Sequence, residues 1–94
     1  MKFSEIGFNY YLVHKPRARY TDAARSNEVQ GTVRLKVTLL ASGTVGTITP
    51  ITTLPHGLTE QAIYAARRIV FIPKKVKEVN VSVIVTFDYN FSIY

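Results

Sequence analysis

The end of the chain, Val79–Phe91, alternates apolar and polar residues over an unusually long stretch. Valines and aromatic residues occupy the odd positions, and polar residues occupy every even position except Ile84. A period of two is typical of a β-strand with one buried face. Because strands usually run for about 3 to 10 residues, a strand of this length predicts an edge that outruns its neighbour or pairs with another chain.

The segments before this strand predict an α+β fold. Residues 21–27 have an N-cap candidate and helix-forming residues, and residues 58–70 carry apolar residues at helical spacing behind an N-cap candidate, Thr59. Residues 32–40 and 45–51 alternate on either side of a turn, so they predict a hairpin. The connectors Lys15–Arg19 and Lys74–Glu78 are charged and are expected at the surface.

The order helix, strand, strand, helix, strand limits the topology. After the second helix crosses the sheet, the last strand is expected to lie antiparallel to the first strand of the hairpin. The spatial order is then second, first, third, with the last strand at an edge. The prediction is therefore a three-stranded antiparallel sheet with two helices on one face. The apolar stretch before His14 is expected to cover the core or an edge, and Phe8–Leu12 could form an extra strand.

Composition argues against catalysis. With 94 residues and 47% hydrophobic content, the chain fits one domain, and it has no cysteine for disulfides or thiolate metal sites. The two histidines, His14 and His56, lie in separate connectors, the six carboxylates are scattered, and no Gly-x-Ser-x-Gly turn occurs. We therefore expect neither an enzyme, a cofactor nor a metal site. Neither a secretion signal nor a membrane span is expected in this chain.

At this point the sequence resembles the C-terminal domain of the TonB family, the energy transducers of bacterial envelopes. The resemblance covers residues 16–91 and rests on the order and spacing of short motifs. These are Tyr20 with Ala24 and Arg25, Gln30-Gly31-Thr32-Val33, Gly43-Thr44-Val45, Ala62 with Ala65-Ala66-Arg67-Arg68, Phe71-Ile72-Pro73 and the alternating strand with Phe87. The chain departs from the family pattern at Thr21 (usually Pro), at Ile69 (usually aromatic) and at Lys77-Glu78 (usually a Gly).

The resemblance implies a periplasmic domain at residues 16–94, preceded by an extension at residues 1–15. In the family such a domain follows an inner-membrane helix and a Pro-rich spacer. It binds the TonB box, a short extended peptide of an outer-membrane transporter used for example in siderophore and iron uptake, and transmits force from a proton-driven motor complex. The peptide adds to the edge of the last strand, and residues ahead of Tyr20 also touch the transporter plug. The implied site residues are Asn80, Val81, Ser82, Val83, Ile84, Val85, Thr86, Phe87, Asp88, Arg17, Arg19 and Tyr20.

Two other interpretations of the sequence stay open. A long edge could pair with the same strand of a second copy, because uncovered edges invite association. The net charge of +6 and the cluster Arg67, Arg68, Lys74, Lys75 and Lys77 could instead bind a polyanion such as RNA or a cell-wall polymer. Nucleic acid is not the expected partner, since the aromatic residues of the last strand share the face of the valines and would be buried. Steep salt dependence would distinguish polyanion binding from strand addition.

Overall fold

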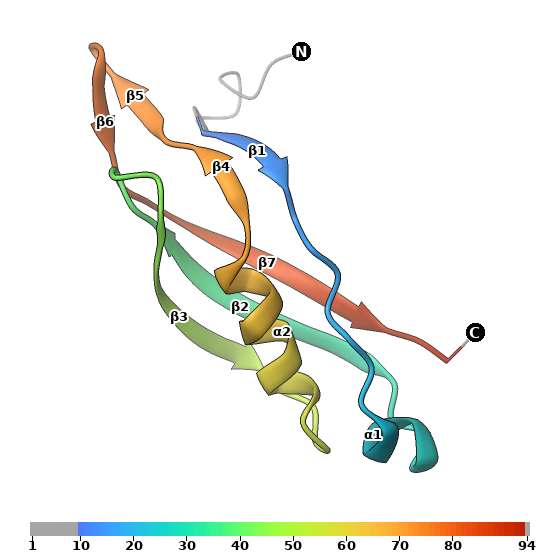
Figure 1. Ribbon diagram of the computed structural model, residues 1–94. Coiled ribbons are helices and arrows are strands. Elements are labelled where there is room, and N and C mark those ends of the chain that lie inside the picture. The colour runs from blue at the N-terminus through green and yellow to red at the C-terminus, as the bar shows by residue number, and fades with distance from the viewer. Residues whose placement is uncertain (1–9, 94) are drawn as a thin grey trace.

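A computed structural model describes residues 10–93 of the chain, which form an α+β fold with a central antiparallel sheet. Around this sheet lie two helices and two short two-stranded ribbons (Figure 1). The elements are β1 (Tyr11–His14), α1 (Asp22–Ser26), β2 (Gly31–Leu39), β3 (Val45–Thr52), α2 (Leu58–Arg67), β4 (Val70–Ile72), β5 (Lys74–Val76), β6 (Val79–Val81) and β7 (Val83–Phe91).

The strand order in the central sheet is β3-β2-β7, all antiparallel, as predicted from the sequence. The β2–β7 register is continuous, from Gly31 opposite Phe91 to Leu39 opposite Val83. The β2–β3 register is interrupted twice, between Arg34 and Leu35 and between Val37 and Leu39. The last strand is thus joined regularly to β2 and lies at an edge of the sheet.

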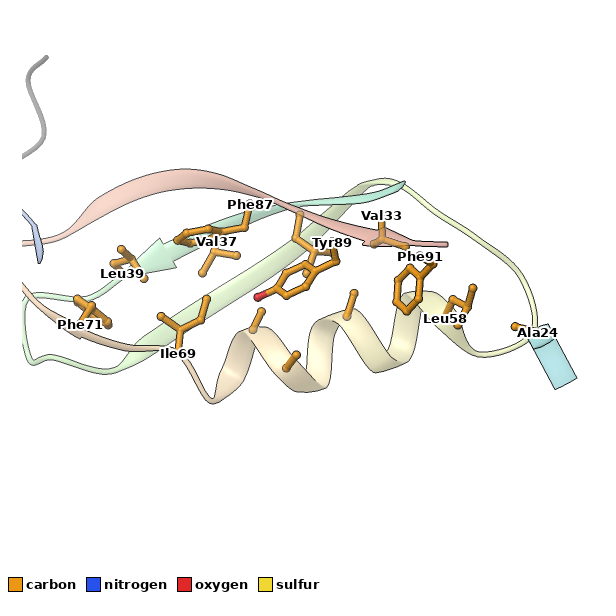
Figure 2. Close-up of a cluster of buried hydrophobic side chains, with 14 residues drawn as sticks. Ala24, Val33, Val37, Leu39, Leu58, Ile69, Phe71, Phe87, Tyr89 and Phe91 are labelled. Carbon is orange, nitrogen blue, oxygen red and sulfur yellow. The ribbon is translucent and has the colours of Figure 1, made fainter. Parts of the chain in front are cut away.

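The core lies between one face of the sheet and α2 (Figure 2). The odd residues of β2 point into it, and Val33, Leu35 and Val37 are completely buried there. The aromatic residues Phe87, Tyr89 and Phe91 of β7 are buried on the same face, as the alternation predicted. From α2 come Leu58, Ala62, Ala65 and Ala66. The small alanine side chains let the helix approach the aromatic rings closely.

Helix α2 differs from its prediction at both ends. Its N-cap is Gly57, whose φ of 83° is accessible to glycine at little cost. Thr59 is buried in the first turn, and its hydroxyl bonds the backbone of Leu54, accepting from N–H at 2.8 Å and donating to C=O at 2.9 Å. The helix ends at Arg67 rather than Val70. Val70–Ile72 form β4 instead, because this segment pairs with β1.

The predicted strand Val79–Phe91 is in fact two strands, β6 and β7, separated at Ser82. The hydroxyl of Ser82 accepts a hydrogen bond from the amide of Ala41 at 2.9 Å, just beyond the end of β2. The segment Lys74–Glu78 lies mostly exposed, as predicted, but it is not a simple connector, since β5 pairs with β6 through a two-residue turn. Lys77 and Glu78 adopt φ values of 51° and 66° in this turn, the conformation usually supplied by Asn-Gly.

The N-terminal strand β1 pairs antiparallel with β4, with Leu12 opposite Phe71. Of the predicted extra strand, Phe8 lies outside the described residues, whereas Leu12 belongs to β1. No helix within residues 10–93 has the length and apolar character needed to cross a membrane.

Candidate functional site

One long side of β7 has no strand partner among residues 10–93, because β2 occupies the other side. The contacts of β2 reveal which backbone groups face this free edge. The amide of Arg34 donates to the Thr52 hydroxyl on β3 at 2.9 Å, and the carbonyl of Thr32 accepts from the same hydroxyl at 3.2 Å. The even residues of β2 therefore direct their backbone groups towards β3.

Backbone directions alternate along an antiparallel strand, so the odd residues of β2 face β7. Their register partners are the odd residues of β7. It follows that the amides and carbonyls of Ile84, Thr86, Asp88 and Asn90 point away from β2, towards the free edge. This edge offers the alternating donors and acceptors that an additional strand would need.

Lys15 contacts this edge from the segment that follows β1. Its Nζ donates a hydrogen bond of 2.8 Å to the carbonyl of Asp88, in agreement with the outward direction of that group. The same Nζ lies 4.4 Å from the ring centroid of Tyr89 and 5.6 Å from that of Phe87. Burial lowers the pKa of the Lys15 ammonium, and the charge of Asp88 partly offsets this.

A groove of about 510 Å³ lies between the C-terminal half of β7 and the segment ahead of α1. Tyr20 helps to hold this segment, since its hydroxyl donates to the carbonyl of Val29 and its ring meets Phe91 edge-on at 5.6 Å. The groove is lined by Lys15, Pro16, Arg17, Ala18, Tyr20, Asp88, Tyr89, Asn90, Phe91 and Ser92.

The side chain of Asp88 lies on the exposed face of the sheet, opposite the core. Its carboxylate accepts from Arg34, Nε–Oδ1 at 2.7 Å and Nη2–Oδ2 at 3.1 Å. Hydrogen bonding from Arg34 lowers the pKa of Asp88. The edge at this residue therefore presents backbone polar groups, while the negative charge is already paired with β2.

The structure separates the predicted site residues into groups. All six residues from Val83 to Asp88 lie on β7. Ile84, Thr86 and Asp88 direct their backbone groups to the free edge, whereas Val83, Val85 and Phe87 direct theirs to β2. Asn80 and Val81 lie in β6 opposite Lys75 and Lys74, and Ser82 lies at the break between the strands. Arg17 and Tyr20 line the groove, whereas Arg19 and Tyr20 line a second, smaller pocket with Thr21, Asp22 and Gln61.

The groove residues that sequence reasoning missed include Lys15, Asn90 and Ser92. Asn90 could have been found, because it continues the even positions of the alternating stretch. Lys15 gave no such signal. Before Pro16 it reads as a solvated connector residue, and its contact with Asp88 spans 73 positions of sequence.

Within residues 10–93, no three His, Asp or Glu side chains lie close enough together to hold a metal ion. The basic residues Lys74, Lys75 and Lys77 lie on the β5–β6 ribbon, which projects from one end of the molecule (Figure 1). The aromatic residues of β7, Phe87, Tyr89 and Phe91, are buried in the core, so their rings are not available to stack nucleic-acid bases (Figure 2).

Known proteins resemble this chain in fold and in sequence pattern. The solution structure of the TonB C-terminal domain of Pseudomonas aeruginosa superposes with a TM-score of 0.73 at 17% identity, over 90% of this chain and 87% of that one. The TonB C-terminal domain of Helicobacter pylori, residues 179–285, gives a TM-score of 0.52 at 24% identity, over 80% of this chain and 70% of that one.

At these identities the two structures establish the fold alone. No curated protein matches the chain. The family described as "Gram-negative bacterial TonB protein C-terminal" matches residues 16–93, which is most of the sequence. The chain therefore belongs to the TonB C-terminal domain family, whose members are periplasmic domains of Gram-negative bacteria involved in TonB-dependent transport.

Proposed function

We propose that this domain captures the TonB-box peptide of an outer-membrane transporter by adding it as a strand to the free edge of β7. The observation that carries the proposal is the row of outward backbone groups on β7, which pairs with β2 in a continuous register. These groups belong to Ile84, Thr86, Asp88 and Asn90. Strand addition takes its affinity from such backbone groups and its selectivity from neighbouring side chains. Arg17 and Tyr20, in the groove, supply side chains next to the peptide.

The proposed role is binding and force transmission, without catalysis. In the complete protein an inner-membrane motor would pull on this domain, and the peptide would carry the load to the transporter. Each net backbone hydrogen bond contributes about 0.5–1.5 kcal/mol, so a few bonds give a moderate, reversible affinity. Asn80, Val81 and Arg19 would contact the peptide or plug only if the contact extended beyond β7.

The test is a titration of the isotopically labelled domain with short peptides from the N-termini of outer-membrane transporters at moderate salt. We expect amide shifts concentrated on residues 83–91 and 15–20, which would barely change when salt is raised. Shifts confined to Lys74–Glu78 that vanish with salt would instead favour a polyanion as the ligand. Sedimentation of the free domain tests whether β7 pairs with a second copy in the absence of peptide.

A further inference from the structure

Lys15 is held at the free edge by two kinds of contact. Its ammonium bonds the outward carbonyl of Asp88 at 2.8 Å and lies over the ring of Tyr89 at 4.4 Å. Lysine usually extends its charge into water, so partial burial of this group has to be offset by the bond and by the ring face. The contact also ties the segment before α1 to a strand near the end of the chain.

A strand that added to β7 would need the same carbonyl. In a sheet the neighbouring amide nitrogen lies about 2.9 Å from the oxygen it bonds, and the Lys15 nitrogen now lies at 2.8 Å from this oxygen. The lysine stem, in the wall of the groove, also stands beside the path of such a strand. Natural sheets often use lysine at an edge to discourage pairing with other chains.

We propose that Lys15 is an intramolecular competitor for the free edge: it occupies the Asp88 carbonyl in the unbound domain and is displaced when a strand adds there. This inference rests on the proposed function. Ile84 and Thr86 lie nearer the start of β7 than Asp88 does, so an incoming peptide bonds them first and completes its pairing at Asp88 only after Lys15 has left. The same contact limits pairing of β7 with a second copy.

The variant Lys15→Met tests this competition. Methionine keeps an unbranched stem that can stay on the aromatic rings but cannot donate to the carbonyl. Lys36→Met is the matched control, because Lys36 is an exposed residue of the central strand β2 and its loss removes the same charge. Peptides from transporter N-termini are the probes, titrated at moderate salt into each protein.

We expect Lys15→Met to bind the peptide about three- to tenfold more tightly, the gain from one bond that is no longer displaced, and Lys36→Met to bind as the parent does. In the parent, the Lys15 Hε signals should lie upfield in the free domain, under the Tyr89 ring, and move to ordinary positions at saturation. Unchanged or weaker binding by Lys15→Met would overturn the competition and leave strand addition standing. If neither the parent nor Lys15→Met bound the peptide, strand addition itself would be overturned, and the competition with it.

Discussion

Arg34 and Asp88 lie directly opposite each other on β2 and β7 and are joined by two side-chain hydrogen bonds, of 2.7 and 3.1 Å. The pair lies at a position where neither backbone bonds the other strand, since the Arg34 amide faces β3. The side chains join the strands on the exposed face, and the Asp88 carbonyl remains directed at the free edge. One residue thus takes part in sheet register and in the candidate site.

The pKa of Asp88 should lie below that of an ordinary aspartate, chiefly because Arg34 bonds its carboxylate. A folded-state pKa below the unfolded value, about 3.9, stabilises the fold above that value, and the contribution is lost as pH falls through the folded pKa. We expect Arg34→Gln to raise the Asp88 pKa, measured from the carboxyl carbon shift during titration. Lys36→Gln removes a charge without this bond and should change it much less.

Thr86→Pro should weaken peptide binding by about tenfold or more, because it removes an outward amide from the middle of the edge. Val85→Pro should mainly destabilise the fold, since the odd residues of β7 face β2. Calorimetric binding and chemical denaturation of both variants separate the two effects. If folded Thr86→Pro bound with unchanged affinity, the peptide would not use the β7 backbone. Thr86→Val keeps the amide and serves as the control.

Tyr89→Phe should leave the domain as stable or raise the free energy of unfolding by about 1 kcal/mol, because a buried polar group without a partner is costly. The Tyr89 hydroxyl is buried and has no hydrogen-bond partner among the described residues, and Figure 2 shows it between the sheet and α2. Tyr20→Phe should do the opposite, since it removes the bond to the Val29 carbonyl. Urea denaturation of both variants gives the comparison, and a clear loss of stability in Tyr89→Phe would mean that the hydroxyl is satisfied.

Burial raises the pKa of Tyr89 to about 12. The folded state holds the phenol proton more tightly than the unfolded state does. The stability linked to this proton is complete below the unfolded tyrosine pKa, about 10, and is lost as pH rises towards 12. The parent should therefore lose more stability between pH 9 and 11.5 than Tyr89→Phe does. Thermal unfolding of both proteins at the two pH values measures this, and identical losses would show that Tyr89 ionises freely.

The β5–β6 turn should be stabilised by Glu78→Gly, by about 1 kcal/mol, because positive φ values strain residues with a side chain. The amides of Val76 and Val79 report local opening through hydrogen exchange and should exchange more slowly in the variant. Gly43→Ala is the converse control. Gly43 has a φ of 94°, so an alanine there should destabilise the turn between β2 and β3. Faster exchange in Glu78→Gly would indicate that the Glu78 side chain holds the turn.

Much of this fold follows from local pattern. The odd positions of β2 and β7 are apolar, and the connection through α2 allows few other strand orders, so sheet order and edge were predictable. The end of α2 was not, because Ile69 and Val70 fit helical spacing and only pairing with β1 makes Val70 a strand residue. The division at Ser82 and the contact of Lys15 with Asp88 depend on residues far away in the sequence.

The continuous β2–β7 register also fixes the spacing of the backbone groups that β7 can offer to a bound peptide. A shift of one residue between these strands would turn Phe87, Tyr89 and Phe91 out into water and bring Thr86 and Asp88 into the core. Such a misaligned sheet would be far less stable. Tension along β7 therefore cannot shift this strand past β2 one residue at a time. A peptide bound to this edge is therefore held against a fixed spacing until the whole contact breaks.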